Sequence, residues 1–332
     1  MNAPARLTLV VLSYRQSTTI DAAVASALGQ VGIAPIDILL SDDASPDDTH
    51  ARMLAHAAAY QGPHRVTVRR NPVNLGIEGH INTVVEAAQT ELIVMMAGDD
   101  ISLPQRAARV AQVWESSGKQ LDLIASDLVD MSAQGEDLGV LRVDDLAQWR
   151  SVKDWARRRP YIVGAAHAFT KRLHTRFGPL QPGVAYEDQA HLLRALCGGG
   201  ACTIAEPLVR YRRGGVSDRM REFSGERFMA WMRRLNRIHV ALHEQWHHDA
   251  SLAGCLDTVT EATEREYQRE RFIAALLAAP GAWARWRIAL QPSPVKTDWR
   301  LRKALYLTWP GLAAAIRAGQ SAWRQHRHGG TR

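Results

Sequence analysis

Aliphatic runs that alternate with segments of helical period most strongly constrain how this chain can fold. Leu7–Leu12, Ile36–Leu40 and Leu92–Met96 are short, continuous and apolar, which is typical of strands covered on both faces of a parallel sheet. Between the first two, apolar residues from Ile20 to Val31 recur at the spacing of one helix face. This alternation over residues 1–115 predicts a doubly wound α/β sheet flanked by helices.

Beyond that region the pattern changes twice. Residues 116–220 carry shorter strand signals, and we expect them to complete the α/β domain as a smaller second half. Within them, residues 127–160 are polar, charged and poor in periodicity, so we expect a long loop with short helices there. Residues 221–332 turn helical with few breakers and predict a C-terminal helical extension.

Charge and cysteine content exclude several classes of function. The net charge is +7, but ten Lys and Arg lie between Arg285 and Arg332 against the single acid Asp298, and the rest is slightly acidic. A basic nucleic-acid groove across the main body is therefore not expected. The three cysteines form no CxxC pair and have no histidine at zinc spacing, so a reducing cytosol fits best. No window reaches the length of about eighteen apolar residues that a spanning helix needs.

Pairs of acidic residues follow two of the predicted strands. Asp42 and Asp43 end the second, and Asp99 and Asp100 follow the run that ends at Met96. Ligands of α/β sheets lie beyond the carboxyl ends of strands. Two carboxylates there suit a hard divalent ion completed by phosphate oxygens, although adjacent acids after a strand are also common as turn formers or helix caps.

Asp42 and Asp43 can accept hydrogen bonds from a nucleobase or ribose, or can cap the helix predicted to start at Pro46. Ser45 already provides a cap, which leaves the aspartates without an obvious structural duty. The loop after the next strand offers amides at three positions, and turn chemistry explains the first two almost as well. These positions are Asn74, Gly76 and Asn82.

Glu187 and Asp188 precede another apolar helix face. Acids in a first helical turn are favoured by the helix dipole, so capping explains them. The functional alternative is a general base, kept ionised at neutral pH by that dipole. Arg212 and Arg213, next to Gly214, form a basic turn that either closes over a diphosphate or is a solvated surface turn.

Taken in order, these motifs resemble those of the family 2 glycosyltransferases. The matching segments are Val11–Tyr14, Ser41–Ser45, Asn74–Ile77, Gly98–Pro104, Tyr186–Asp188 and Tyr211–Arg213. The resemblance covers roughly residues 5–218. It implies a GT-A fold with a mixed, mainly parallel sheet, in which residues 1–115 bind a nucleotide-sugar and residues 116–220 the acceptor.

The resemblance also implies roles for individual residues. Nucleotide binding falls on Ser13, Tyr14, Asp42, Asp43, Asn74 and Gly76. Asp99 and Asp100 would hold Mg²⁺ or Mn²⁺ on the diphosphate, Asp188 would be the catalytic base with Glu187 as a second acidic candidate, and Arg212 and Arg213 would close over the diphosphate. Ala97 stands where the family's Asp-x-Asp has its first carboxylate, so Asp99 must contribute more. Gly214 or Gly215 replaces a histidine often found after the late Tyr-Arg.

The same resemblance suggests the reaction and its setting. It implies inverting transfer, most commonly from a UDP-sugar, to an acceptor that is a lipid-linked saccharide of a bacterial surface polysaccharide. The Gln-x-x-Arg-Trp element of processive synthases is absent, which favours single additions. The alternative is a glycosyltransferase-like scaffold that has lost metal binding through Ala97. Either protein is expected in the cytoplasm, with the inner membrane face as a candidate site of attachment.

The C-terminal tail supplies a candidate contact with an anionic membrane. It combines clustered Lys and Arg with five of the ten tryptophans, and tryptophan favours membrane interfaces. They are Trp283, Trp286, Trp299, Trp309 and Trp323. We expect an interfacial helix pair from Trp299 to Trp323 broken at Pro310, or a tail whose tryptophans pack on the protein while its arginines face water.

Overall fold

The computed structural model describes residues 7–214 and 224–316, which divide into two compact units. The first comprises Met1–Asp218 with Gln245–Val259, and the second comprises Arg219–Glu244 with Thr260–Arg332. The predicted boundary after residue 220 lies between the described ranges. Residues 245–259, which we assigned to the extension, group with the first unit.

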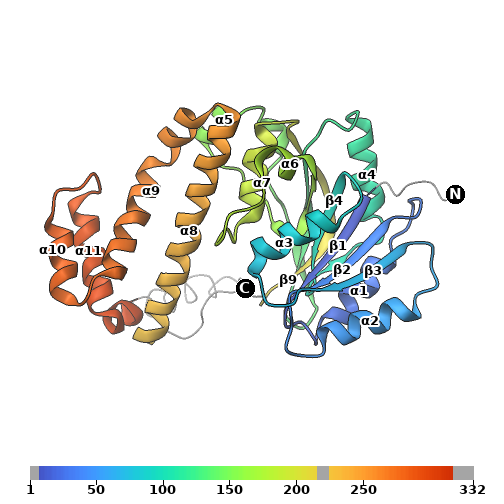
Figure 1. Cartoon of the computed structure of the whole chain (residues 1–332), viewed down its shortest axis with the longest axis horizontal. Helices are drawn as coiled ribbons and strands as arrows, with labels where there is room; N and C mark the ends of the chain where they lie inside the picture. The colour runs from blue at the N-terminus through green and yellow to red at the C-terminus, as the bar shows by residue number, and fades with distance from the viewer. Residues whose placement is uncertain (1–6, 215–223, 317–332) are drawn as a thin grey trace, which may run out of the picture. The chain divides into compact units, whose positions relative to one another are not determined.

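A mixed sheet forms the centre of the first unit (Figure 1). Its strands are β1 (Leu7–Ser13), β2 (Asp37–Asp42), β3 (Arg65–Arg70), β4 (Leu92–Ala97), β5 (Ile101–Ser102), β6 (Leu123–Met131), β7 (Asp137–Leu141), β8 (His167–Thr170) and β9 (Ala201–Arg212). The order is β3-β2-β1-β4-β8-β6-β9-β5, with β7 on β6. Strands β3, β2, β1 and β4 are parallel, whereas β8 is antiparallel to both β4 and β6.

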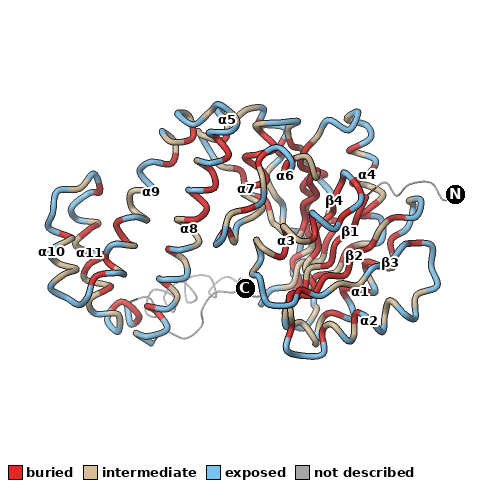
Figure 2. Tube along the Cα trace, viewed as in Figure 1, coloured by how far each residue is buried: buried red, intermediate tan, exposed pale blue. Residues whose placement is uncertain are grey.

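Helices flank this sheet and bury its aliphatic strands. They are α1 (Ile20–Leu28), α2 (Thr49–Ala59), α3 (Gly76–Ala87), α4 (Arg106–Ser116), α5 (Val152–Arg157), α6 (Arg172–Phe177) and α7 (Glu187–Leu196). Leu9 and Val11 of β1 belong to one buried cluster with Val24 of α1 and Val110 of α4. Val10, which lies between Leu9 and Val11 in the strand, is also buried but does not belong to that cluster. Strand β1 is thus covered on both faces, as its continuous apolar run predicts (Figure 2).

Two sequence-based boundaries are wrong. Strand β6 continues to Met131 and forms a hairpin with β7, in place of the loop expected from residue 127. Its acidic residues are tolerated in a strand because they have partners: the Asp127 carboxylate accepts a hydrogen bond from the Val143 amide at 3.0 Å. Helix α2 begins at Thr49 and not at Pro46, since the Asp47 carboxylate accepts the Thr49 amide hydrogen bond at 3.2 Å.

The second unit is helical, as expected. It contains most of α8 (Gly225–Ala253) and α9 (Leu256–Ala278), followed by α10 (Ala282–Leu290) and α11 (Thr297–Thr308). Phe228 of α8, Leu276 of α9 and Leu307 of α11 belong to one buried cluster, which gives this unit a core of its own. Among residues 7–214 and 224–316, no helix is both long and apolar enough to cross a membrane.

Candidate active site

The carboxyl ends of three parallel strands bring the acidic motifs to one edge of the sheet. Ser13 at the end of β1 pairs with Asp42 at the end of β2, and Leu12 pairs with Ala97 at the end of β4. The Asp43 amide donates to the Ser13 carbonyl oxygen at 2.9 Å, which extends this pairing beyond the strands. Residues far apart in the sequence therefore form neighbouring turns at this edge.

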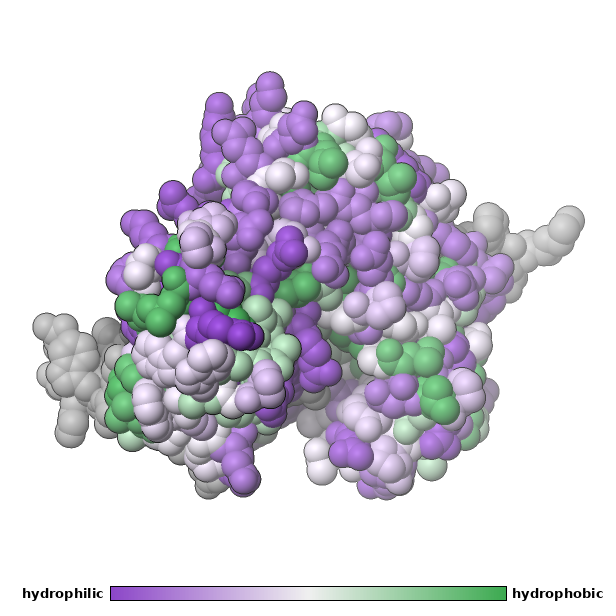
Figure 3. Space-filling model, turned by 60° about the vertical axis from the view of Figure 1, so that its left-hand side comes forward, coloured by the Kyte–Doolittle hydropathy of each residue, from purple (hydrophilic) through white to green (hydrophobic). Residues whose placement is uncertain are grey.

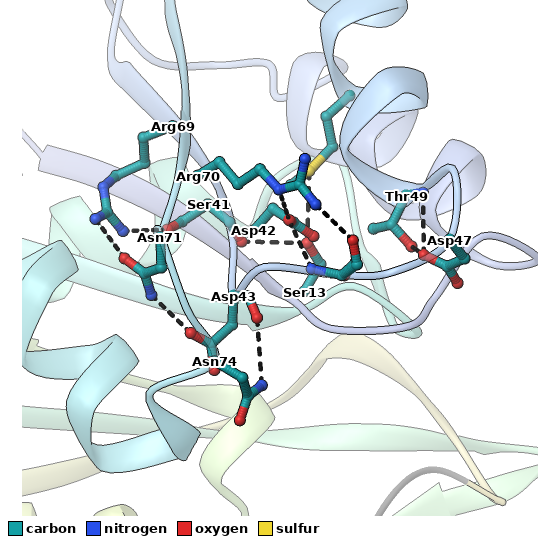
Figure 4. A network of polar contacts seen from close by, with 12 residues as sticks. Ser13, Ser41, Asp42, Asp43, Asp47, Thr49, Arg69, Arg70, Asn71 and Asn74 are labelled. Atoms are coloured by element: carbon teal, nitrogen blue, oxygen red, sulfur yellow. Dashed lines mark hydrogen bonds and ion pairs between the residues drawn. The ribbon is translucent and has the colours of Figure 1, made fainter.

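Asp43 holds the loop that follows β3 (Figure 4). Its carboxylate accepts hydrogen bonds from Asn71 Nδ2 at 2.7 Å and from the amides of Leu75 at 2.9 Å and Gly76 at 3.1 Å. Asn74 Nδ2 donates to the Asp43 carbonyl oxygen at 3.2 Å. Gly76 has a φ of +77°, a conformation that favours glycine. Three predicted nucleotide-binding residues thus belong to one network.

Asp42 and Ser13 lie on the buried side of the same network. One carboxylate oxygen of Asp42 accepts the Ser45 amide at 3.0 Å and pairs with Arg70 Nε at 3.2 Å, while the other is buried without a partner. Ser13 Oγ donates to the Ser41 carbonyl oxygen at 3.1 Å. The sequence offered no structural duty for Asp42 and Asp43, but each stabilises a turn.

Two further residues named from the sequence lie apart from these contacts. The Arg15 guanidinium lies over the half-buried Tyr14 ring, 5.2 Å from the centroid of that ring. Asn82 is inside α3, where its amide exchanges hydrogen bonds of 2.9 and 2.8 Å with the Leu180 backbone. Asn82 therefore fixes a neighbouring loop instead of offering its amide at the sheet edge.

Sequence reasoning missed the polar residues that contact Asn71 and Ser41 next to Asp43. Arg69 of β3 donates to Ser41 Oγ at 2.7 Å and to Asn71 Oδ1 at 2.6 Å. Ser41 Oγ also lies 2.6 Å from His80 Nε2. Burial lowers the pKa of His80 to about 4, so its imidazole is neutral near pH 7. These contacts join β2, β3 and α3, and no local pattern in the sequence indicates them.

The second acidic pair follows β4 directly. Asp100 is 1% exposed, and its carboxylate accepts the Arg212 amide at 2.8 Å, while its other oxygen is buried without a partner. The Asp99 carbonyl oxygen accepts Arg212 Nε at 3.0 Å. Gly98 allows this turn to approach β1, because a Cβ there would lie 3.0 Å from Ser13 Cβ.

The electrostatics of this pair suit a cation. Burial, and then the charge of Asp99, raises the pKa of Asp100 to about 8, and burial raises the pKa of Asp99. A divalent ion would stabilise both carboxylates in their ionised form and would engage the unpartnered Asp100 oxygen. Within the described ranges no group of three or more His, Cys, Asp or Glu residues could hold a metal. An ion here would thus take its remaining ligands from substrate phosphate and water.

Arg106, which the sequence reasoning did not single out, connects this pair to a distant loop. Its fully buried guanidinium donates to the carbonyl oxygens of Met95 at 2.6 Å and Ala165 at 3.1 Å. Burial lowers its pKa to about 10, while the charge of Asp100 opposes this, so the side chain stays protonated at neutral pH. The segment held at Ala165 is the one that packs against α7.

Glu187 and Asp188 begin α7, and both pKa values are raised. Burial raises the pKa of Asp188 to about 6, and burial with the charge of Asp188 raises that of Glu187 to about 8. The helix dipole was expected to favour the charged form, but desolvation is larger. Asp188 still accepts the Gln189 amide at 2.8 Å. Asp188 is thus mostly ionised at pH 7 and titrates just below it, as a general base requires.

A row of three histidines, of which His167 and His191 are buried and His174 is half-buried, supports the loop beside this pair. His167 Nδ1 contacts the Gly164 carbonyl oxygen, His167 Nε2 lies 3.3 Å from His191 Nδ1, and His191 Nε2 lies 3.0 Å from His174 Nε2. Burial lowers the pKa of all three, so they are neutral. Because a carbonyl can only accept, every hydrogen bond in the row must donate toward Gly164. A Cβ on Gly164 would lie 2.4 Å from Glu187 Oε1, so glycine allows the pair to pack there.

The predicted closing arginines already have partners, which are backbone carbonyl oxygens for the Arg212 guanidinium and a carboxylate for Arg213. Arg212 contacts the turn of Asp99 and Asp100, and Arg213 forms an ion pair with Asp130 of β6, with Nε 2.8 Å from Oδ1. Asp130 was not predicted because it is 83 residues from Arg213 in the sequence. Gly215, one of the two glycines noted after this turn, lies outside the described residues.

The charges of the acidic groups act on two tyrosines. Burial raises the pKa of Tyr211, and the charges of Asp100 and Asp99 raise it further. Burial also raises the pKa of Tyr161, with contributions from Asp188 and Asp130. Tyr161 also raises the pKa of Tyr211, so the two tyrosines share this electrostatic environment.

Comparison with known proteins gives consistent results. Residues 8–135 match the family model described as glycosyl transferase family 2. The chain is 29% identical over 242 residues to succinoglycan biosynthesis protein ExoO of Rhizobium meliloti (strain 1021), a match that covers 65% of each chain. Together these matches show that the chain is similar to family 2 glycosyltransferases, and that it spans about two thirds of the length of ExoO.

Solved structures with the same architecture include two with bound nucleotide-sugars. S. aureus TarS 1-349 in complex with UDP-GlcNAc has 14% identity and a TM-score of 0.54, with 98% of this chain and 92% of that one covered. Mannosyltransferase PcManGT from Pyrobaculum calidifontis in complex with GDP-Man and Mn²⁺ has 17% identity and a TM-score of 0.53, covering 95% and 87%. The first unit therefore has a GT-A-like fold, and extra C-terminal helices follow it.

Proposed function

We propose that the protein is a family 2 glycosyltransferase that transfers a sugar, with inversion, from a nucleotide-diphosphate sugar to an acceptor hydroxyl. The observation that carries this proposal is the placement of Asp99 and Asp100 at the carboxyl end of β4, beside the network of Asp42 and Asp43, together with Asp188 at the start of α7. Such a site has oxygen ligands for a metal-bound diphosphate and a carboxylate that titrates near neutrality.

The donor would bind at the edge formed by β1, β2 and β4. The network of Ser13, Asp42 and Asp43 presents turns to a nucleoside, with Tyr14, Asn74 and Gly76 beside it. The nucleotide-sugar complexes of TarS and PcManGT support a donor of this class, and we propose a UDP-sugar. Arg212 and Arg213 would contribute positive charge near the diphosphate.

Asp99 and Asp100 would hold Mg²⁺ or Mn²⁺. The bound ion supplies Lewis-acid stabilisation of the charge that develops on the diphosphate as it leaves. The chain contributes the ligand geometry: the Arg212 amide fixes one oxygen of Asp100, and the other oxygen has no hydrogen-bond partner. Arg106 adds a fixed positive charge beside the same carboxylate.

Asp188 would act on the acceptor. Its carboxylate takes the proton of the acceptor hydroxyl while that oxygen attacks the anomeric carbon, and the bond to the diphosphate oxygen breaks with its electron pair leaving on the diphosphate. One displacement inverts the anomeric configuration. Glu187, with a pKa near 8, is mostly protonated at pH 7 and would keep a second negative charge away from Asp188.

The acceptor would be a saccharide used in surface polysaccharide synthesis, which the name of ExoO supports, and we propose a lipid-linked one at the cytoplasmic membrane face. The second candidate function, a scaffold without transfer activity, is favoured only by Ala97 at the expected ligand position.

A donor screen separates the two functions. The full chain would be incubated with UDP-, GDP- and dTDP-sugars and simple saccharide acceptors, with Mn²⁺ or with EDTA, and the released nucleotide measured. We expect metal-dependent release with one donor, and NMR of the product should show an inverted anomeric centre. Asp37→Asn, at the opposite end of β2 from Asp42, is the matched control that should retain activity. Metal-independent binding of nucleotides without any turnover would favour the scaffold.

A further inference from the structure

The second unit carries an apolar surface that the transfer reaction does not use. Among the described residues, its Trp283 and Leu290 are the most exposed large apolar side chains, at 74% and 69%. Trp309 and Leu312 are also half exposed. On the face that Figure 3 turns toward the viewer, hydrophobic residues lie in patches between hydrophilic ones. An exposed tryptophan on a short helix requires an explanation, because such side chains normally pack or bind.

These residues form one continuous face. Trp283, Arg287 and Leu290 are four and three positions apart, and so lie on the same side of α10. Together with Trp286, Gln291 and Pro292 they line an open cleft of about 490 Å³. The Trp286 ring lies 6.3 Å from that of Trp309, which extends the face beyond α11. We call the surface of Trp283, Trp286, Arg287, Leu290 and Trp309 the α10 face.

The charge around the α10 face has one sign. Residues 282–316 contain six Lys and Arg but a single acid, Asp298. The guanidinium groups of Arg285 and Arg300 donate hydrogen bonds to backbone carbonyl oxygens of this unit. Of the other four, Lys303 is half-buried with its ammonium 5.2 Å from the centroid of the Trp299 ring, and Arg287, Lys296 and Arg302 are exposed. The Arg287 guanidinium lies 5.2 Å from the centroid of the Trp283 ring.

The tryptophans that are exposed in the structure differ from those expected from the sequence to contact a membrane. Trp299, the start of the expected interfacial pair, is only partly exposed and packs against Phe272 with ring centroids 6.1 Å apart. Trp299 therefore packs against the core of the helical unit. Trp283 and Trp309 are the exposed ones, while Trp323 lies outside the described residues.

We propose that the α10 face docks the protein on an anionic lipid surface. Tryptophan and leucine insert at the level of the headgroups, and arginine at the rim pairs with lipid phosphate. A second copy of the chain fits less well, because the α10 face carries Arg287 and no acid, so that a symmetric contact offers this cation no opposite charge. Each basic residue near an anionic surface strengthens binding roughly fivefold, so the exposed cations make the contact selective for anionic lipid.

Vesicle flotation tests this proposal without any donor or acceptor. The full chain would be mixed with phosphatidylcholine vesicles with or without phosphatidylglycerol, at low and high salt. We expect binding to the anionic vesicles at least tenfold stronger than to the neutral ones, and weaker at high salt. Equal binding to both vesicle types would overturn the proposal.

Variants locate the contact. Trp283→Ser combined with Leu290→Ser should weaken binding at least tenfold, and Arg287→Gln roughly fivefold. Val31→Ser combined with Val140→Ser is the matched control, since both valines are 56% exposed and lie in the first unit. Circular dichroism verifies that every variant is folded. Unchanged binding of the α10 variants, an equal loss in the control, or a wild-type dimer that the α10 variants dissociate would each contradict the proposal.

Discussion

Replacing Asp188 with Asn should make the protein more stable and nearly inactive. The raised pKa of Asp188 means that the folded state holds its proton more tightly than the unfolded chain does. Stability therefore falls as pH rises from about 4 to about 6, and the full penalty of the ionised carboxylate is present at pH 7. Asparagine removes this charge and can still accept the Gln189 amide hydrogen bond.

The size of both effects follows from the pKa and the proposed role. A shift to about 6 corresponds to at most about 3 kcal/mol, and partial solvent exposure reduces this to about 1 to 2 kcal/mol. The melting temperature at pH 7.5 should rise by several degrees, and the gain should disappear below about pH 4. Loss of general-base assistance should lower kcat about 10² to 10⁴-fold, which is about 3 to 5 kcal/mol.

Thermal melts across pH and initial rates of nucleotide release measure the two effects. Wild-type kcat should fall about tenfold per pH unit below pH 6, because only the ionised carboxylate accepts the proton. Asp154→Asn is the control: a hydrogen bond from Ser151 lowers the pKa of that half-buried carboxylate, so removal of its charge should give no gain in stability. A destabilised Asp188→Asn protein, or one with kcat within tenfold of wild type, would refute the reasoning.

Three further changes have defined outcomes. Asp99→Asn should weaken Mn²⁺ activation at least tenfold, measured by titrating metal into EDTA-treated protein, whereas an unchanged metal requirement would exclude Asp99 as a ligand. Arg194→Met should cost about 3 to 5 kcal/mol in chemical denaturation, because it leaves Asp249 charged and buried, and adding Asp249→Leu should recover most of it; additive losses would contradict this. Gly199→Ala should destabilise by about 1 to 3 kcal/mol, since its Cβ would lie 1.8 Å from a backbone carbonyl oxygen, while Gly311→Ala, with open space around it, should be neutral.

The sequence predicts the parts of the fold that depend on local patterns. The continuous apolar runs of β1, β2 and β4 are buried on both sides, and the acidic pairs follow them at one sheet edge. The sequence does not predict the second half of β6, because Asp127 and Asp130 make this part of the strand resemble a polar loop. Their partners are Val143 and Arg213, and only the folded chain brings them close.

The candidate site is predictable in its acidic residues but not in their surroundings. Asp99, Asp100 and Asp188 are visible because each follows a strand or begins a helix. Their raised pKa values are not visible, since desolvation depends on packing from segments such as the one Arg106 holds at Ala165. The dipole argument predicted the wrong direction for Asp188 because it counts only the residue's own helix.

The three histidines in and next to α7 are uncharged, but the hydrogen bonds that join them all run in one direction. Their N–H groups all point from His174 through His191 and His167 toward Gly164, so three imidazole dipoles are aligned head to tail. Their positive ends face the residue on which Glu187 packs. Such a row favours negative charge at the start of α7 in the way a helix N-terminus does, although none of its members carries a net charge. Aromatic rings of similar size would fill the same volume but would leave the Gly164 carbonyl unpaired and the row without direction.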